Sequence, residues 1–338
     1  MPDMHRYRRY PDPIGWRRRL AAAIVGVAVA AGHVVIAGCG ASGRAGGGRG
    51  PEQAHLTVAV LPATDDAPFW LALRDGYFRR QGLTVTPEVV AQSTLAVPDL
   101  RRGTVQVIGG GNYVTFFQAE ARGALDVRVI APAGSCTGDD FSVVALPRSG
   151  IHGPAGLAGK KIAVGLTGSI STLTITEMLR ADDVDAASVH YVAVPYPAML
   201  AALSRGDVAA ASLVEPFLSE AEARLGAEVI QPQCQGPTAN LPLSGYFATA
   251  AWVRAHPRTA RAFARAIERA QALADDDRAA VENVLPTYIR ITRQVAALVN
   301  LNAYPTGLDP VAIQRVADLM YSGGLLAKPL PVAPLLFR

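Results

Sequence analysis

The chain has few histidines, lysines and cysteines, and it lacks the motifs that mark several classes of active site. Its six histidines are scattered, so neither a pair at i, i+4 nor an HExxH zinc motif occurs. No serine lies in a GxSxG elbow, and no glycine-rich stretch fits a nucleotide-binding P-loop. We therefore expect no metal, no cofactor and no enzymatic activity.

The positive charge of the chain is concentrated in its first 38 residues. The formal net charge is +4, from 32 basic and 28 acidic residues. Residues 1–38 hold six arginines and two aspartates, which leaves 26 residues of each sign in the remainder. An electrically neutral remainder has no basic footprint for nucleic acid, so we expect no such partner.

The amino terminus has the three parts of an export signal. A basic stretch precedes an apolar run that starts at Leu20, and small residues then lead to Cys39. This order predicts a bacterial lipoprotein signal peptide, with residues 1–38 removed and a diacylglyceryl group attached to Cys39. The protein would then be held at the extracytoplasmic face of the cell membrane. An uncleaved membrane anchor is one alternative, because 20–38 is about as long as a bilayer is thick. A cleaved peptide without a lipid is the other, and Arg17-Arg18-Arg19-Leu20 leaves twin-arginine export open beside the general export route.

Residues 39–54 are predicted to be the lipidated cysteine followed by a flexible tether. The stretch is rich in glycine and polar residues, and it contains Gly46-Gly47-Gly48. Such a composition cannot bury enough apolar area to offset the entropy of ordering the chain.

Strands and helices alternate from residue 55 onward, which predicts an α/β fold with parallel sheets. Short runs rich in β-branched residues predict strands at 56–61, 85–90, 104–108, 126–131, 141–146, 162–164, 189–192, 208–213 and 248–253. The intervening patterns predict helices at 69–82, 95–102, 113–122, 171–180, 197–204, 258–274, 281–299 and 310–322. The glycines at 109–111 are expected to form a turn.

Several segments resemble one family of binding proteins. They are Phe69-Trp70 through Gly82-Leu83, the stretch Leu157–Val164, the stretch Leu203–Ala210, and Val214-Glu215-Pro216-Phe217. Their order and spacing resemble the periplasmic-type solute-binding proteins of ABC importers, in the branch with nitrate, sulfonate, taurine and thiamine-precursor receptors. The resemblance covers about residues 55–320.

The resemblance implies a two-lobed type II periplasmic-binding-protein fold. Lobe 1 would comprise 55–145 and 245–338, lobe 2 would comprise 146–244, and two hinge crossings would lie near 141–150 and 243–250. It also implies a monomeric receptor that passes a small polar organic solute to an ABC permease and its ATPase. A surface sensor that feeds no importer, and an enzyme of thiamine or menaquinone biosynthesis on the same fold, remain as alternatives.

Ligands of open α/β sheets bind beyond the carboxyl ends of the strands, beside helix amino termini. That rule selects the candidate ligand-binding residues Asp65, Trp70, Asn112, Thr167, Ser169, Ser171 and Glu215, with Tyr246 near the second crossing. Helix capping or core packing is the alternative for each. The chain has only three lysines, and none lies on these loops. An aminosulfonate or an amine-bearing pyrimidine is therefore a better candidate ligand than an inorganic anion such as nitrate.

Cys136 and Cys234 form an even pair once Cys39 is assigned to the lipid. Both precede an expected crossing, and an oxidising compartment would allow them to form a disulfide. Two separate buried thiols are the alternative.

Overall fold

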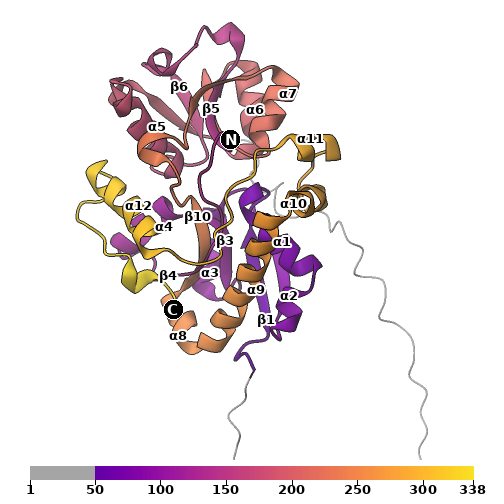
Figure 1. Cartoon of the computed structure of the whole chain (residues 1–338). Helices are drawn as coiled ribbons and strands as arrows, with labels where there is room; N and C mark the ends of the chain where they lie inside the picture. Colours follow the sequence, from indigo (N-terminus) through magenta and orange to yellow (C-terminus); the bar gives the residue numbers. More distant parts are fainter. Residues whose placement is uncertain (1–49) are drawn as a thin grey trace, which may run out of the picture. The chain divides into compact units, whose positions relative to one another are not determined.

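Two five-stranded sheets organise the part of the chain that the computed structural model describes, residues 50–338 (Figure 1). The predicted signal peptide, Cys39 and most of the predicted tether lie outside the described residues. Each sheet is covered by helices, and each has one strand that runs against the other four. This is the expected two-lobed α/β architecture.

The first sheet is built from two separate stretches of the chain. Its strands, in spatial order, are β2 (Thr84–Val89), β1 (His55–Val60), β3 (Val107–Asn112), β10 (Ser244–Thr249) and β4 (Val127–Pro132). Strand β1 pairs in parallel with β2 and β3, whereas β10 is antiparallel to both β3 and β4. The strand that returns from the second lobe therefore lies between two strands of the first.

The helices associated with the first sheet come from both ends of the described chain. They are α1 (Ala67–Arg74), α2 (Tyr77–Arg80), α3 (Val97–Arg102), α4 (Tyr113–Ala121), α8 (Ala250–Ala255), α9 (Pro257–Asp276), α10 (Arg278–Val284), α11 (Arg293–Leu298) and α12 (Pro310–Ser322). One apolar core includes residues of α1 and α9, and a second includes residues of α4 and α12. Helix α9 buries Phe263 and Ile267 together with a row of alanines, so its amphipathic pattern was a sound predictor.

The second sheet has the strand order β7 (His190–Ala193), β6 (Lys161–Val164), β8 (Ala210–Val214), β5 (Phe141–Ala145) and β9 (Glu228–Pro232). Its helices are α5 (Ile170–Ala181), α6 (Tyr196–Arg205) and α7 (Phe217–Leu225). Strand β5 pairs with β8 and β9, whereas the sequence analysis placed residues 141–145 in the first lobe. The two crossings between the lobes therefore run through 133–140 and 233–243.

The glycines at 109–111 extend strand β3 and do not form the expected turn. A Cβ atom added to Gly109 would lie 2.7 Å from the Tyr246 ring, and one added to Gly111 would lie 2.7 Å from the Phe116 ring. The bare backbone lets these rings pack directly onto the sheet. The sequence predicted a turn at these glycines, whereas in the structure they allow aromatic rings to approach the strand backbone closely.

Two predictions for the carboxyl-terminal half are wrong. The expected helix 281–299 is two helices, α10 and α11, because the chain turns through a 3-10 segment that contains Pro286. The expected strand 248–253 is the end of β10 followed by α8, whose amino terminus is capped by Thr249 through the N–H of Trp252. The predicted helix 69–82 is likewise divided, at Asp75-Gly76, into α1 and α2.

The last residues assigned to the tether belong to the folded body. Glu52 accepts hydrogen bonds from the backbone N–H groups of Arg258 and Thr259, at 3.1 and 2.8 Å, at the start of α9. Gln53 accepts one from the indole N–H of Trp252 at 2.8 Å. Residues 52 and 53 thereby fix where the chain enters lobe 1.

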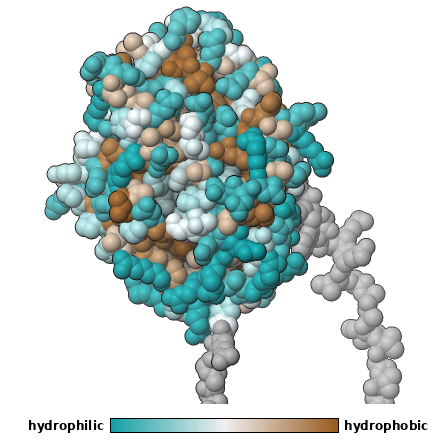
Figure 2. All heavy atoms as spheres, viewed as in Figure 1, coloured by the Kyte–Doolittle hydropathy of each residue, from teal (hydrophilic) through white to brown (hydrophobic). Residues whose placement is uncertain are grey.

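No helix among the described residues is both long and apolar enough to cross a bilayer. On the face shown in Figure 2, hydrophobic residues form small separate patches among hydrophilic ones.

Candidate functional site

A cavity lies between the two lobes at the carboxyl ends of their strands. Its volume is about 70 Å³, which is enough for roughly five waters or a ligand of a few non-hydrogen atoms. The lining from lobe 1 comprises Leu61, Ala63, Asp65, Ala91, Gln92, Ser93, Thr94, Gly110, Asn112, Leu243 and Ser244. Lobe 2 supplies Phe141, Gly165, Leu166, Ser169, Ile170, Tyr196 and Val214. The cavity therefore has an apolar frame with a few polar groups placed in it, as small-molecule sites do.

Asp65 supplies a buried carboxylate to the lobe 1 wall. It lies in the short turn between β1 and α1, and only 8 % of its surface is exposed. Oδ2 accepts a hydrogen bond from the hydroxyl of Ser244, whereas Oδ1 is buried without a partner. Burial raises the pKa of this carboxyl above its ordinary value. A donor from a bound molecule would relieve the unpaired oxygen.

The lobe 2 wall is formed by the amino terminus of α5. Ser169 precedes the helix, is 2 % exposed, and its hydroxyl caps no backbone N–H and has no hydrogen-bond partner. Ser171 lies in the first turn and is equally buried and unpartnered, but it does not line the cavity. The N–H groups of a first helical turn have no acceptor within the helix. This wall therefore presents hydrogen-bond donors to the cavity.

Gln92 and Tyr196 narrow the cavity where the lobes meet. The side-chain amide of Gln92, which follows β2 in lobe 1, donates a hydrogen bond to the carbonyl oxygen of Gly165 in lobe 2. A Cβ atom on Gly165 would lie 3.2 Å from the Tyr196 ring, so glycine allows this close contact. Burial raises the pKa of Tyr196 to about 12, which keeps its hydroxyl protonated.

Asn112 lines the cavity and also caps a helix. Its side-chain oxygen accepts a hydrogen bond of 2.9 Å from the N–H of Thr115 in α4. The amide nitrogen remains as a donor. Asn112 is therefore both a helix cap and a cavity residue, the two roles that the sequence allowed for it.

Three more candidate residues, Trp70, Tyr246 and Thr167, lie away from the cavity lining. Trp70 stacks on Tyr288 with ring centroids 4.8 Å apart, and Tyr246 is fully buried in the same core. Both are large apolar rings, which the lobe 1 core accommodates. Thr167 is exposed on the loop before α5.

Glu215 secures the junction between the lobes. Its carboxylate accepts hydrogen bonds from the N–H and hydroxyl of Ser219 in α7, at 3.1 and 2.8 Å, and from the N–H of Asn300 at 2.9 Å. Its backbone oxygen accepts one from the N–H of Thr64 in lobe 1 at 3.3 Å. Burial raises the pKa of Glu215 to about 6. These contacts assign it a structural role beside the cavity.

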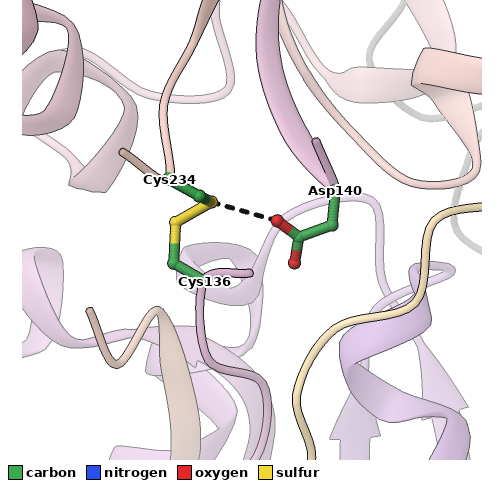
Figure 3. Close-up of side chains that lie close together, drawn as sticks. All are labelled: Cys136, Asp140 and Cys234. Atoms are coloured by element: carbon green, nitrogen blue, oxygen red, sulfur yellow. Dashed lines mark hydrogen bonds between the residues drawn. A yellow bond between two sulfur atoms is a disulfide. The ribbon is translucent and has the colours of Figure 1, made fainter. Parts of the chain in front are cut away.

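The two crossings are joined by a disulfide between Cys136 and Cys234, whose Cα atoms are 5.2 Å apart (Figure 3). Asp140 lies beside it, with Oδ1 3.0 Å from the sulfur of Cys234. A disulfide sulfur has no hydrogen to give, so only the protonated carboxyl can donate in this contact; the same oxygen accepts a 3.2 Å hydrogen bond from the N–H of Thr137. Burial raises the pKa of Asp140 to about 8, which favours its protonated form. The other oxygen accepts a 2.8 Å bond from Asn302.

These two sulfurs and the Asp140 carboxylate are close enough together to surround a metal ion. Metal binding requires thiolates, and sulfurs that are bonded to each other cannot supply them. The two sulfurs therefore form a covalent link between the crossings. Among the described residues, the group of Cys136, Asp140 and Cys234 is not a metal centre in this form.

Gln92 and Tyr196 line the cavity but were not predicted from the sequence. Both follow strands at their carboxyl ends, so the rule that selected Asp65 and Ser169 also applied to them. Gln92 begins the polar trio Gln92-Ser93-Thr94, which follows β2 after Val90 and Ala91, and that trio was the available signal. Tyr196 was hidden by its place in the apolar pattern of α6.

Comparison with known proteins now adds an independent line of evidence. The family model described as NMT1/THI5 like matches residues 63–279, which is more than half of the chain and includes most of the cavity lining.

The chain belongs to the NMT1/THI5-like family. No curated protein matches it.

Solved structures show the same fold at low sequence identity. The alkanesulfonate-binding protein SsuA from Xanthomonas axonopodis pv. citri, bound to MOPS, has a TM-score of 0.72 and 20 % identity, covering 85 % of this chain and 99 % of that chain. The periplasmic nitrate-binding protein NrtA from Synechocystis PCC 6803 has a TM-score of 0.70 and 14 % identity, covering 82 % and 84 %. A ligand-binding component of an ABC-type import system from Staphylococcus aureus has a TM-score of 0.73 and 14 % identity, covering 84 % and 96 %. These neighbours are solute-binding proteins, and the family and fold agree with the resemblance seen in the sequence.

Proposed function

We propose that this protein is an extracytoplasmic receptor that binds a small polar organic solute between its lobes and delivers it to the permease and ATPase of an ABC importer. The cavity carries this proposal, because two residues that line it, one from each lobe, each hold a buried polar atom without a partner: Asp65 Oδ1 and Ser169 Oγ. A buried polar atom without a partner costs about 1–3 kcal/mol. A ligand that pairs with both atoms would recover that free energy and draw the lobes together.

The structural neighbours support the transport role. Two of them bind sulfonate or nitrate, and the third is a component of an ABC-type import system. For this chain we propose an organic solute of the aminosulfonate or aminopyrimidine kind. The cavity lining contains no lysine or arginine, which argues against an inorganic anion as the cargo.

We further propose that Cys39 carries a lipid anchor and that the receptor acts as a single copy. The amino-terminal pattern supports the anchor, and the face drawn in Figure 2 carries only small, separate apolar patches. Cells supplied with labelled palmitate should incorporate the label into the wild-type protein and not into Cys39→Ser. A wild-type protein that carries no label and keeps residues 1–38 would favour an uncleaved anchor.

A ligand screen followed by an uptake assay tests the receptor role. Residues 40–338 would be screened by thermal shift against sulfonates, nitrate, thiamine precursors and amino acids. A solute at 100 times its dissociation constant adds about 2.7 kcal/mol of stability. Uptake of the solute that binds should then fall in cells that lack this protein. Binding with unchanged uptake would instead indicate a sensor, and silence across the panel would count against solute capture.

A further inference from the structure

Asp65 is the only residue with a charged side chain among the described residues that line the interlobe cavity. None of the others is lysine, arginine or histidine. A ligand with a net negative charge would therefore enter a poorly solvated space that holds a carboxylate and no opposing cation. Like charges in such surroundings repel strongly, because the low local dielectric constant screens them weakly.

The surroundings of Asp65 are acidic on the lobe 1 side. Asp66 is its neighbour in the chain, and Asp140 lies behind it on the first crossing. Burial is the main cause that raises the pKa of both neighbours, and the nearby Asp65 raises each further. Asp65 itself is stabilised by the hydroxyl of Ser244, and no basic side chain contributes to its environment in the described structure. Among the described residues, the lobe 1 wall therefore has no positively charged group to balance Asp65.

The opposite wall has the reverse character. Ser169 offers a buried hydroxyl without a partner, and the first turn of the twelve-residue helix α5 adds free backbone N–H groups. The positive end of the helix dipole lies at the same place. Tyr196 also lines the cavity, and its protonated hydroxyl interacts with the side chain of Ser171. Oxygen acceptors, whether neutral or charged, would be satisfied at this wall.

We propose that the ligand is a small primary ammonium compound with oxygen acceptors at its other end. The ammonium group is held by Asp65, and the oxygens are held by Ser169 and the amide groups of α5. The cavity volume of about 70 Å³ is in keeping with a small ligand. This inference rests on the proposed function, since it takes the interlobe cavity to be the solute site.

Matched pairs of probes that differ only in the amino group test the inference. The pairs are taurine with ethanesulfonate and β-alanine with propionate, and binding to the folded protein is measured by calorimetry. The member with an ammonium group should bind at least tenfold more tightly in each pair, because it adds a hydrogen bond between charged groups. Equal or tighter binding of the partner without nitrogen would overturn the proposal.

Two variants test which residue holds the ammonium group of the ligand and which holds its oxygens. Asp65→Asn keeps the shape and one acceptor oxygen of the side chain, and it should weaken the ammonium probes by roughly 10- to 100-fold. Asp207→Asn, which alters an exposed carboxylate paired with Arg205, is the control and should leave binding unchanged. Ser169→Ala should weaken taurine and β-alanine but not propylamine, which has no oxygens to bind.

The outcomes separate this inference from the proposed function. If ethanesulfonate or propionate binds and the amines do not, the ligand class is wrong while solute capture stands. If neither the amines nor the anions bind, both the ligand class and the assignment of the cavity lose support. If ammonium probes bind equally well to the wild-type protein and to Asp65→Asn, the role of Asp65 is refuted.

Discussion

Removing the disulfide between the crossings should destabilise the protein without changing its fold. We consider the double variant Cys136→Ala/Cys234→Ala. The bond joins residues 98 positions apart, and closing a loop of that length in the unfolded chain corresponds to about 4.7 kcal/mol at 25 °C in the chain-entropy model. Because the effect acts on the unfolded chain, the variant should also unfold with a larger dependence on denaturant, since its unfolded state is less compact.

Urea denaturation monitored by tryptophan fluorescence would measure both quantities. We expect the free energy of unfolding to fall by about 3–5 kcal/mol in the double variant. The control is the wild-type protein kept in a strong reductant, which should unfold like the variant, because both then lack the bond. The reasoning is refuted if the variant and the oxidised wild type unfold at the same urea concentration, or if alkylation without reductant labels both cysteines of the wild type.

Two further predictions concern the hinge and the cavity. The free energy of unfolding should fall as the pH rises from about 4 to about 8, since unfolded Asp140 ionises near pH 3.9 while the folded residue keeps its proton up to a pKa of about 8. The slope of this loss is at most about 1.4 kcal/mol per pH unit, and Asp140→Asn should flatten it; equal slopes in the two proteins would contradict the assignment. Gly165→Ala should cost about 1–3 kcal/mol, because the new methyl group meets the Tyr196 ring at 3.2 Å. Thermal unfolding would measure this, and a change below 0.5 kcal/mol would show that the ring moves aside.

The sequence predicted correctly the helices and strands that are determined by neighbouring residues. Helix α12 was predicted at its observed limits, because Asp309 and Pro310 mark its start and an apolar face follows. Strand β3 was predicted at 104–108 but runs over Val107–Asn112, where Gly110 has a positive φ and the rings of Tyr246, Phe116 and Phe247 pack against its neighbouring glycines. The sequence cannot show that packing before the fold is known.

The same distinction applies to the candidate site. Asp65 and Ser169 were found because the carboxyl end of a strand is a position that can be read from the sequence. Trp70 and Glu215 satisfied the same rule, yet the structure uses the first in a core and the second as a clamp between lobes. Whether a residue at such a position faces the cavity depends on the rotation of its element, which is determined by packing.

The position of β10 affects the order in which the protein can assemble. A chain is synthesised from its amino terminus, and domains tend to fold in that order. Strand β4 pairs with β10 and not with β3, so the first sheet stays divided until residues 244–249 have been made. All strands of the second sheet precede that point, which makes lobe 2, inserted in the middle of the chain, the first part able to complete its sheet. The lobe that begins the chain is thus the last to close, and its unpaired strand edges are where a misfolded or aggregating intermediate should arise.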